Sequence, residues 1–384
     1  MARGYANSMD FLEWQYYGAG QRYLNKKDSG YSFAKDTDVT TGVTGVYQPI
    51  YGASAWVQTN HEANGFGVLP KYAGDRTGWR VITADAGSTA DGGIAQDGNI
   101  PDTVVPTWAT VSAIPKTVAH AFSASEVQTA VSEAGDDTTG DMASLREYFA
   151  SRHRMALNEQ LFRDVDSTAD TRFESIDRVT SAHAEIAEQS LGAGDADIYG
   201  LDRDASTSWS DAIYDGNSGV DRDLTDQLLL DLVDNTKEAG ANSTMFMTGT
   251  DTYASIQALF EPQVRYQVLN DTKVQLTNNG IQTPNGIDVG ITVSQLYGLP
   301  IIVSKDVQKD TISRVYLLDT SDPEGLGVPR LGLRIHRPTQ YFENGIQNGD
   351  PFGINRFGDE GVYRTMGELI CKRFDCQGKL RDLK

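Results

Sequence analysis

The sequence is short of the residues from which most metal and redox sites are built. Its 384 residues include two cysteines and five histidines, and the histidines are spread along the chain. A structural zinc needs a full set of Cys and His ligands, which two isolated thiols do not supply. Cys371 and Cys376 lie close together in the sequence. We expect two reduced, partly buried thiols there, with a disulfide across a hairpin as the alternative.

Long apolar runs and catalytic motifs are also missing. No stretch approaches the roughly 18 apolar residues that cross a bilayer. The start of the chain, Met1-Ala2-Arg3-Gly4, lacks a basic-then-apolar signal region. There is no Gly-x-Ser-x-Gly elbow, no His-Glu-x-x-His pair and no phosphate-binding glycine loop. We therefore expect no membrane segment, no cofactor and no enzyme activity.

Positive charge is scarce relative to negative charge. The chain carries 53 acidic and 33 basic residues, a net charge of −20, with more Asp than Glu and more Arg than Lys. Self-repulsion destabilises such a protein at low salt, whereas a Debye length of about 3 Å at molar salt removes most of it. This composition is typical of extreme halophiles, and an ordinary acidic protein is the alternative. Because no basic cluster stands out, we expect no sequence-independent DNA binding by a basic face.

One acidic loop, 195–206, begins like a calcium-binding loop. Tyr199 and Ser206 occupy its fifth and twelfth positions, although the last position requires a bidentate Glu. We expect a solvated acidic loop and keep a loosely bound cation as the alternative. The candidate ligands for such a cation are Asp195, Asp197, Asp202 and Asp204.

Two segments have little hydrophobic core of their own. Eight of the 35 aromatic residues lie before residue 34, in a polar stretch that we expect to form an arm. This arm lies either across a neighbouring subunit or on its own domain. The second segment, 65–104, is rich in glycine and contains a strand-like piece at 79–83. A lone hairpin is marginal in water, so we expect a projecting β-loop supported by an adjacent chain; a disordered loop is the alternative.

The remaining pattern predicts an α/β domain between β-rich segments. Apolar spacing predicts a long helix at 141–163, with Met142 and Phe149 on its apolar stripe. A second helix is expected from Thr225, as N-cap, to Gly240, as stop. A short helix is predicted at 251–259. Strands are predicted at 104–112, 117–122, 175–186, 244–248, 291–293, 300–304, 314–319 and 330–336, with a closing strand pair at 361–373.

The order of these parts resembles the Hong Kong 97-type major capsid fold of tailed phages, haloarchaeal tailed viruses and encapsulin shells. The stretch 223–259 is similar to the helix, strand and short helix of that family's axial domain. The stretch 297–304 is similar to its Gly-x-Pro-Val-x-x-Ser strand, with Ile301 in place of the Val. The stretch 366–380 resembles the last strands of its peripheral domain. The resemblance therefore follows the chain in order over nearly its whole length.

The resemblance implies an α+β fold of five parts. These are the N-arm (1–50), an N-terminal strand with the extended β-loop (51–104), a peripheral domain with a spine helix (105–173), an axial domain (174–339) and closing strands of the peripheral domain (340–384). It implies a major capsid protein that self-assembles as hexamers and pentamers into an icosahedral virion around double-stranded DNA. Assembly is expected in the host cytoplasm, with portal, scaffold and decoration proteins as partners. An encapsulin-like compartment and a halophilic soluble enzyme or binding protein remain the alternatives.

The resemblance also implies contacts between subunits. Some family members join subunits through a Lys–Asn isopeptide bond, for which Asn355 lies in a plausible partner loop. Lys71, at the base of the extended loop, is the only lysine between residues 36 and 115. No lysine lies near the tip, so we expect no cross-link. The residues expected at contacts between subunits are Phe11, Trp14, Tyr16 and Tyr17 in the arm and Lys71, Arg76, Trp79 and Arg80 in the loop.

Overall fold

The computed structural model describes part of the chain in detail. The described residues are 60–74, 77–84, 93–99, 103–127, 142–167, 171–192, 194–203, 208–260, 294–323, 325, 327–345 and 357–384. The predicted N-arm lies outside them, as do the predicted strand at 291–293 and Asn355. Within these ranges, no helix combines the length and apolar character needed to span a bilayer.

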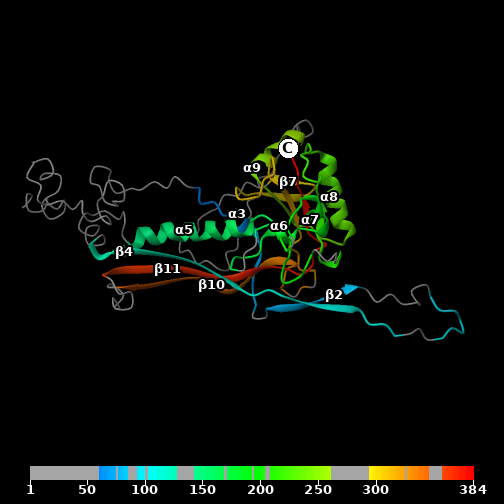
Figure 1. The fold of residues 1–384 in the computed structure, drawn as a ribbon, viewed down its shortest axis with the longest axis horizontal. Coiled ribbons are helices and arrows are strands. Elements are labelled where there is room, and N and C mark those ends of the chain that lie inside the picture. Colours follow the sequence, from blue (N-terminus) through cyan, green and yellow to red (C-terminus); the bar gives the residue numbers. More distant parts are fainter. Residues whose placement is uncertain are drawn as a thin grey trace, which may run out of the picture. The chain divides into compact units, whose positions relative to one another are not determined.

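The described chain mixes helices and strands along its whole length (Figure 1). The helices are α3 (Asn64–Val68), α5 (Met142–Leu161), α6 (Ile176–Val179), α7 (His183–Glu188), the 3₁₀ turn η2 (Ser208–Ser210), α8 (Asp226–Glu238) and α9 (Thr250–Phe260). The strands are β1 (Lys71–Ala73), β2 (Gly78–Ala84), β3 (Thr107–Ser112), β4 (Lys116–Ser125), β5 (Ile213–Asp215), β6 (Met245–Thr248), β7 (Ser294–Leu296), β8 (Leu299–Val303), β9 (Val315–Leu318), β10 (Leu331–Gly345), β11 (Gly358–Cys371) and β12 (Gly378–Leu380).

The chain divides into two compact units. Unit 1 comprises Met1–His61, Ala119–His153 and Gln340–Arg364, and unit 2 comprises Glu62–Val118, Arg154–Thr339 and Thr365–Lys384. The division falls inside α5, β4, β10 and β11, so these elements contribute residues to both units. Three of these elements are strands of a four-stranded sheet of order β1-β10-β11-β4.

Unit 2 is built around a six-stranded mixed sheet of order β5-β12-β9-β6-β8-β7. The helix α8 buries Leu229, Leu232 and Val233 in the same core cluster as Phe246 of β6 and Leu380 of β12. This burial follows the spacing of apolar residues along one helical face. The helix α8, whose amphipathic pattern is evident in the sequence, therefore shares one core with β6 and β12 of the sheet.

Both ends of α8 lie where the sequence predicts them. Thr225 accepts a hydrogen bond from the backbone N–H of Leu228 at 3.4 Å, which satisfies one of the free donors of the first turn. After the last turn, Gly240 has a positive φ of 82°, a conformation that glycine adopts without steric cost. The predictions for α5, α9, β2, β3, β4, β6, β8 and β9 are likewise confirmed to within a few residues.

Two predictions of secondary structure are wrong. The stretch 175–186, predicted as a strand, forms the short helices α6 and α7. The side chain of Ser175 caps α6 by accepting from the backbone N–H of Arg178, so local capping decides the conformation. The predicted strand pair at 361–373 is instead the single strand β11. Its glycines mark close packing: a side chain at Gly367 would approach the carbonyl oxygen of Arg334 to 2.7 Å.

Unit 1 is held together by aromatic side chains. Phe122 of β4 stacks on Phe149 of α5 with ring centroids 4.7 Å apart. Tyr341 of β10 and Tyr363 of β11 lie beside them, at 6.1 Å from the Phe122 ring. A side chain at Gly361 would clash with Phe122 and Tyr341, so this glycine leaves room for the rings. The predicted apolar stripe of α5 is thus used here to bury aromatic surface.

The two cysteines are reduced and buried. Neither Cys371 nor Cys376 forms a disulfide, and both are inaccessible to solvent. Burial raises the pKa of the Cys376 thiol to about 12. The expectation of free thiols is confirmed, and their high pKa makes them poor nucleophiles.

Candidate functional site

The strands β2 and β3 form a hairpin in unit 2 that carries several exposed side chains. The strands pair antiparallel, with Trp79 opposite Val111, Val81 opposite Ala109, and Ile82 opposite Trp108. Because side chains alternate across a strand, the hairpin has two distinct faces. In Figure 1, β2 lies apart from the helices α7, α8 and α9 of the same unit.

The inner face of the hairpin packs on its own unit. Trp79 and Val81 are half-buried against the main core cluster. The Trp79 ring meets Tyr199 edge-on, with centroids 5.3 Å apart. Tyr199 is itself fixed, because its hydroxyl donates to the carbonyl of Leu369 at 2.6 Å. The hairpin therefore takes support on one face from its own subunit, which the sequence prediction did not anticipate.

The outer face carries an apolar pair that nothing covers in the described chain. Ile82 is 51% exposed and its cross-strand partner Trp108 is 56% exposed. Arg80 and Thr110, which also face each other, are exposed beside them. Single exposed apolar residues are ordinary, but a paired Ile and Trp on one sheet face form a patch. Further exposed apolar side chains near the hairpin in sequence are Ile94, Val104, Val105 and Ile114.

Three of the eight predicted contact residues lie in the described part of the chain, two of them on this hairpin. Trp79 is on the inner face, Arg80 on the outer face, and Lys71 in β1. The Lys71 ammonium donates to the carbonyl of Phe66 at 2.6 Å and lies 4.5 Å from the centre of the Phe66 ring. Burial lowers the pKa of Lys71 to about 8. The remaining five, Phe11, Trp14, Tyr16, Tyr17 and Arg76, lie outside the described residues.

Two carboxylates of the predicted acidic loop accept hydrogen bonds from backbone N–H groups. Asp195 accepts the backbone N–H of Gly192 at 2.6 Å, and Asp197 accepts that of Arg203 at 3.0 Å. Asp202 is exposed, and Asp204 lies outside the described residues. In the part of the chain that the structure describes, no three His, Cys, Asp or Glu side chains gather as metal ligands would.

A buried ionic network that joins α6 and α7 to the strands β9 and β12 was not predicted from the sequence. Asp177 of α6, fully buried, contacts Arg314 at 2.8 Å and Lys379 of β12 at 3.3 Å. Tyr316 of β9 donates to the same carboxylate at 2.8 Å. Burial acts to raise the pKa of Asp177, but Arg314 and Lys379 outweigh it and hold that pKa well below its usual range. The carboxylate is therefore ionised and tied to two strands at once.

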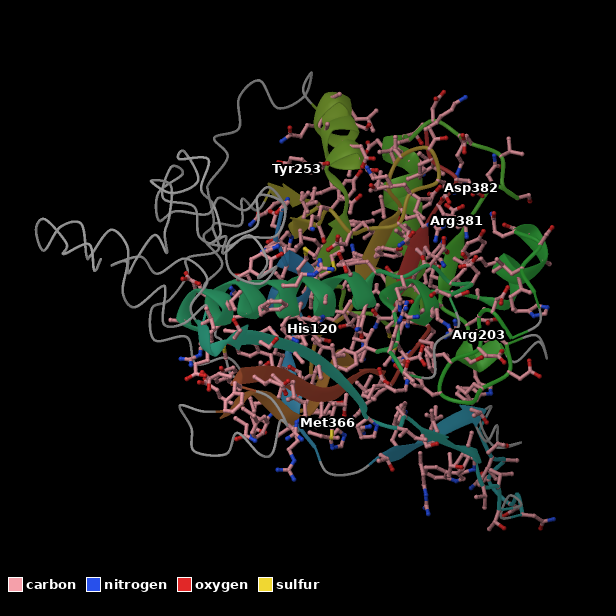
Figure 2. All side chains as sticks on the ribbon, turned by 60° about the vertical axis from the view of Figure 1, so that its left-hand side comes forward. His120, Arg203, Tyr253, Met366, Arg381 and Asp382 are labelled. Carbon is pink, nitrogen blue, oxygen red and sulfur yellow. The ribbon has the colours of Figure 1, made fainter. Side chains whose placement is uncertain are left out.

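The network continues from α7 to the end of the chain. Glu185 of α7 contacts Lys379 at 2.5 Å and Arg381 at 2.6 Å. Asp310 joins Arg314 and Arg381 at 2.9 and 3.1 Å. Arg381 and Asp382 follow β12 directly (Figure 2). Because each of these three cations meets at least two carboxylates, the network ties α6 and α7 to the sheet.

Comparison with known proteins identifies relatives of this fold. A family model described as SU10 major capsid protein matches residues 95–321. No curated protein matches the chain in sequence.

Three solved structures illustrate the likeness. The cyanophage A-1(L) capsid asymmetric unit has 13% identity and a TM-score of 0.58, over 86% of this chain and 95% of that one. The capsid of the native GTA particle has 12% identity and a TM-score of 0.50, over 86% and 92%. The holo-SrpI encapsulin complex from Synechococcus elongatus PCC 7942 has 11% identity and a TM-score of 0.46, over 88% and 94%. The first two establish the fold, so the α+β Hong Kong 97-type fold predicted from the sequence is confirmed.

Proposed function

The chain belongs to the SU10 major capsid protein family, and from this premise we propose that it self-assembles as hexamers and pentamers into an icosahedral virus shell enclosing double-stranded DNA. The observation that carries the proposal is the bare outer face of the β2–β3 hairpin. Ile82 and Trp108 are each more than half exposed, and in the assembled shell they pack against the surface of a neighbouring copy. Burying such side chains contributes about 1.5–3 kcal/mol each, and repetition around a ring multiplies the gain.

The same proposal assigns the other parts of the chain. Residues 1–50 are an arm that contacts neighbours through Phe11, Trp14, Tyr16 and Tyr17, and Arg76, Trp79 and Arg80 contribute from the extended loop. Lys71 joins them at the base of the loop. Residues 105–173 and 340–384 form the peripheral domain, and 174–339 form the axial domain. Portal, scaffold and decoration proteins are the expected partners, in a virion assembled in the host cytoplasm.

The charge of the chain bears on how DNA is held. With a net charge of −20, the subunit repels a polyanion unless counterions intervene. We therefore propose that DNA is retained by confinement, without sequence-specific contacts. The same acidity supports adaptation to a salt-rich environment, because molar salt screens repulsion between neighbouring subunits.

Substituting the apolar pair tests the hairpin's role. Ile82→Asp together with Trp108→Asp should leave the subunit folded, because both side chains are exposed, and should abolish shells in electron micrographs. The matched control is Val220→Asp, another apolar residue of unit 2, which is 62% exposed and should assemble normally. Normal shells from the double variant would remove the hairpin from the assembly surface.

A second measurement tests the shell itself. Light scattering and electron microscopy of the unmodified chain should show large closed particles at molar salt. A monomer or small oligomer under every condition would overturn the proposal. Nucleic acid of genome length inside the particles supports a virus, whereas protein cargo would favour an encapsulin-like compartment.

A further inference from the structure

We propose that His120 and His153 form an acid-sensitive latch that holds the first part of α5 to β4 within unit 1. Neither the assembly surface nor the ionic network of unit 2 uses these two residues. Figure 2 labels His120, which lies where β4 runs alongside α5. His153 is the last residue of α5 that belongs to unit 1.

The geometry of the pair requires that one ring be neutral. The two Nδ1 atoms are 2.8 Å apart, and the rings meet edge-on with centroids 5.0 Å apart. A hydrogen bond between two imidazole nitrogens needs one N–H donor and one unprotonated acceptor. If both imidazoles are protonated to imidazolium, both Nδ1 atoms carry a hydrogen, so the bond is lost and two cations face each other at contact distance. The contact can therefore exist only while at least one of the histidines is unprotonated.

The surroundings offer little to compensate a second charge. His153 is 1% exposed, and its ring lies 6.2 Å from that of Tyr363 on β11. On β10, Glu343 is already bound to Arg146 of α5 at 2.5 Å and accepts the Tyr341 hydroxyl. On α5 itself, His153 is flanked in the sequence by Arg152 and Arg154, which are both cations. No free carboxylate among these named neighbours is positioned to stabilise an imidazolium.

These contacts set the direction of the pH response. Burial, and then the neighbouring His120, lower the pKa of His153 from 6.5 to about 4. A base whose pKa is depressed in the closed state takes up protons when that state opens, so acid favours opening. The stabilisation is fully present above the ordinary pKa of about 6.5 and falls as pH drops toward about 4. Over that window the open fraction rises about tenfold per pH unit, up to about 300-fold.

Opening the latch exposes the aromatic cluster of unit 1. The stacked rings of Phe122 and Phe149 lie on the same two elements as the histidine pair. Acid would then expose apolar surface on each subunit. The consequence for a shell, a loss of rigidity in acid, rests on the proposed function; the latch itself belongs to the single chain.

Hydrogen–deuterium exchange on the full-length chain, unassembled, tests the latch between pH 7.5 and 4.5. After correction for the intrinsic rate, peptides covering 119–125 and 142–153 should lose protection below about pH 6.5, about tenfold per unit. His153→Phe keeps an aromatic ring without a titrating group and should flatten this response. His61→Phe, in the same unit, is the matched control and should respond like the unmodified chain. A flat profile for the unmodified chain, or an unchanged profile in His153→Phe, overturns the proposal.

A second variant keeps the test decisive if His153→Phe does not fold. His120→Phe removes both the facing charge and the hydrogen-bond partner, so the pKa of His153 rises and the loss of protection should level off at a higher pH. An unshifted profile would overturn the latch. Because exchange is measured on unassembled chains, a result that refutes the latch does not affect the shell proposal. In the same way, failure to observe shells does not affect the latch.

Discussion

Replacing Asp177 by Asn tests whether the buried ionic network stabilises unit 2. The substitution keeps the side-chain volume and removes the charge that faces Arg314 at 2.8 Å and Lys379 at 3.3 Å. Removing one partner of a buried pair costs about 3–5 kcal/mol. Arg314 keeps Asp310 at 2.9 Å, and Lys379 keeps Glu185 at 2.5 Å. We therefore expect the lower end of this range, about 3 kcal/mol.

The exposed pair of Arg373 and Asp375 provides the control. Its atoms are 2.7 Å apart, nearly the distance of the buried pair, but both side chains are 43% exposed. Asp375→Asn should cost at most about 1 kcal/mol, because solvent screens such pairs. Urea unfolding, read by hydrogen exchange in 176–188 and 378–384, compares the two variants. If Asp177→Asn destabilises the chain no more than Asp375→Asn, the network does not contribute as argued.

The same variant has a predicted pH signature. Because the pKa of Asp177 is depressed in the folded chain, its contribution is present above the ordinary carboxyl pKa of about 4 and is lost as pH falls below it. Asp177→Asn should therefore lose less stability than the unmodified chain on acidification below that pH. An identical acid response in both proteins would show that this carboxylate is not the group concerned.

Two further outcomes follow from other parts of the fold. Thr225→Ala removes the cap of α8 and should lower the free energy of unfolding, measured in urea, by about 1 kcal/mol. Thr225→Ser keeps the hydroxyl and should be nearly neutral. Equal losses in the two variants would show that the cap hydroxyl does not stabilise the helix. Lowering the salt from molar to about 0.1 M lengthens the Debye length to about 10 Å. Shells should then dissociate, as measured by light scattering, at salt concentrations where circular dichroism still shows a folded chain. Shells whose stability does not depend on salt would contradict the proposed adaptation.

The sequence predicted those elements whose signals are local. The apolar spacing of α5 and α8, the cap at Thr225 and the stop at Gly240 each involve residues within a few turns of one another. The strands β6, β8 and β9 could be predicted because they are short apolar runs between turn residues. Local signals failed where packing gives a residue another role. Gly361 and Gly367 lie in the stretch predicted as a strand pair, but within the single strand β11 they make room for a neighbouring ring and a carbonyl oxygen.

The buried ionic network could not be read from the sequence. Asp177 and Lys379 are separated by 202 positions, and each resembles any surface charge when its neighbours along the chain are considered. Likewise, the pairing of Ile82 with Trp108 depends on the register of the hairpin, which a one-residue slip would change. The sequence placed a β-loop there but could not say which face would be bare.

The division of charge between core and surface links these findings. Among the described buried side chains, seven are basic and six are acidic, so the interior is nearly neutral although the chain carries −20. The excess of acid therefore lies outside this core. Ionic pairs inside are desolvated and poorly screened, whereas carboxylates on the surface are fully exposed to salt. Salt should consequently act first where the surfaces of two subunits meet, and acid should act first at the partly buried histidine pair. The two conditions therefore affect different contacts in the same molecule.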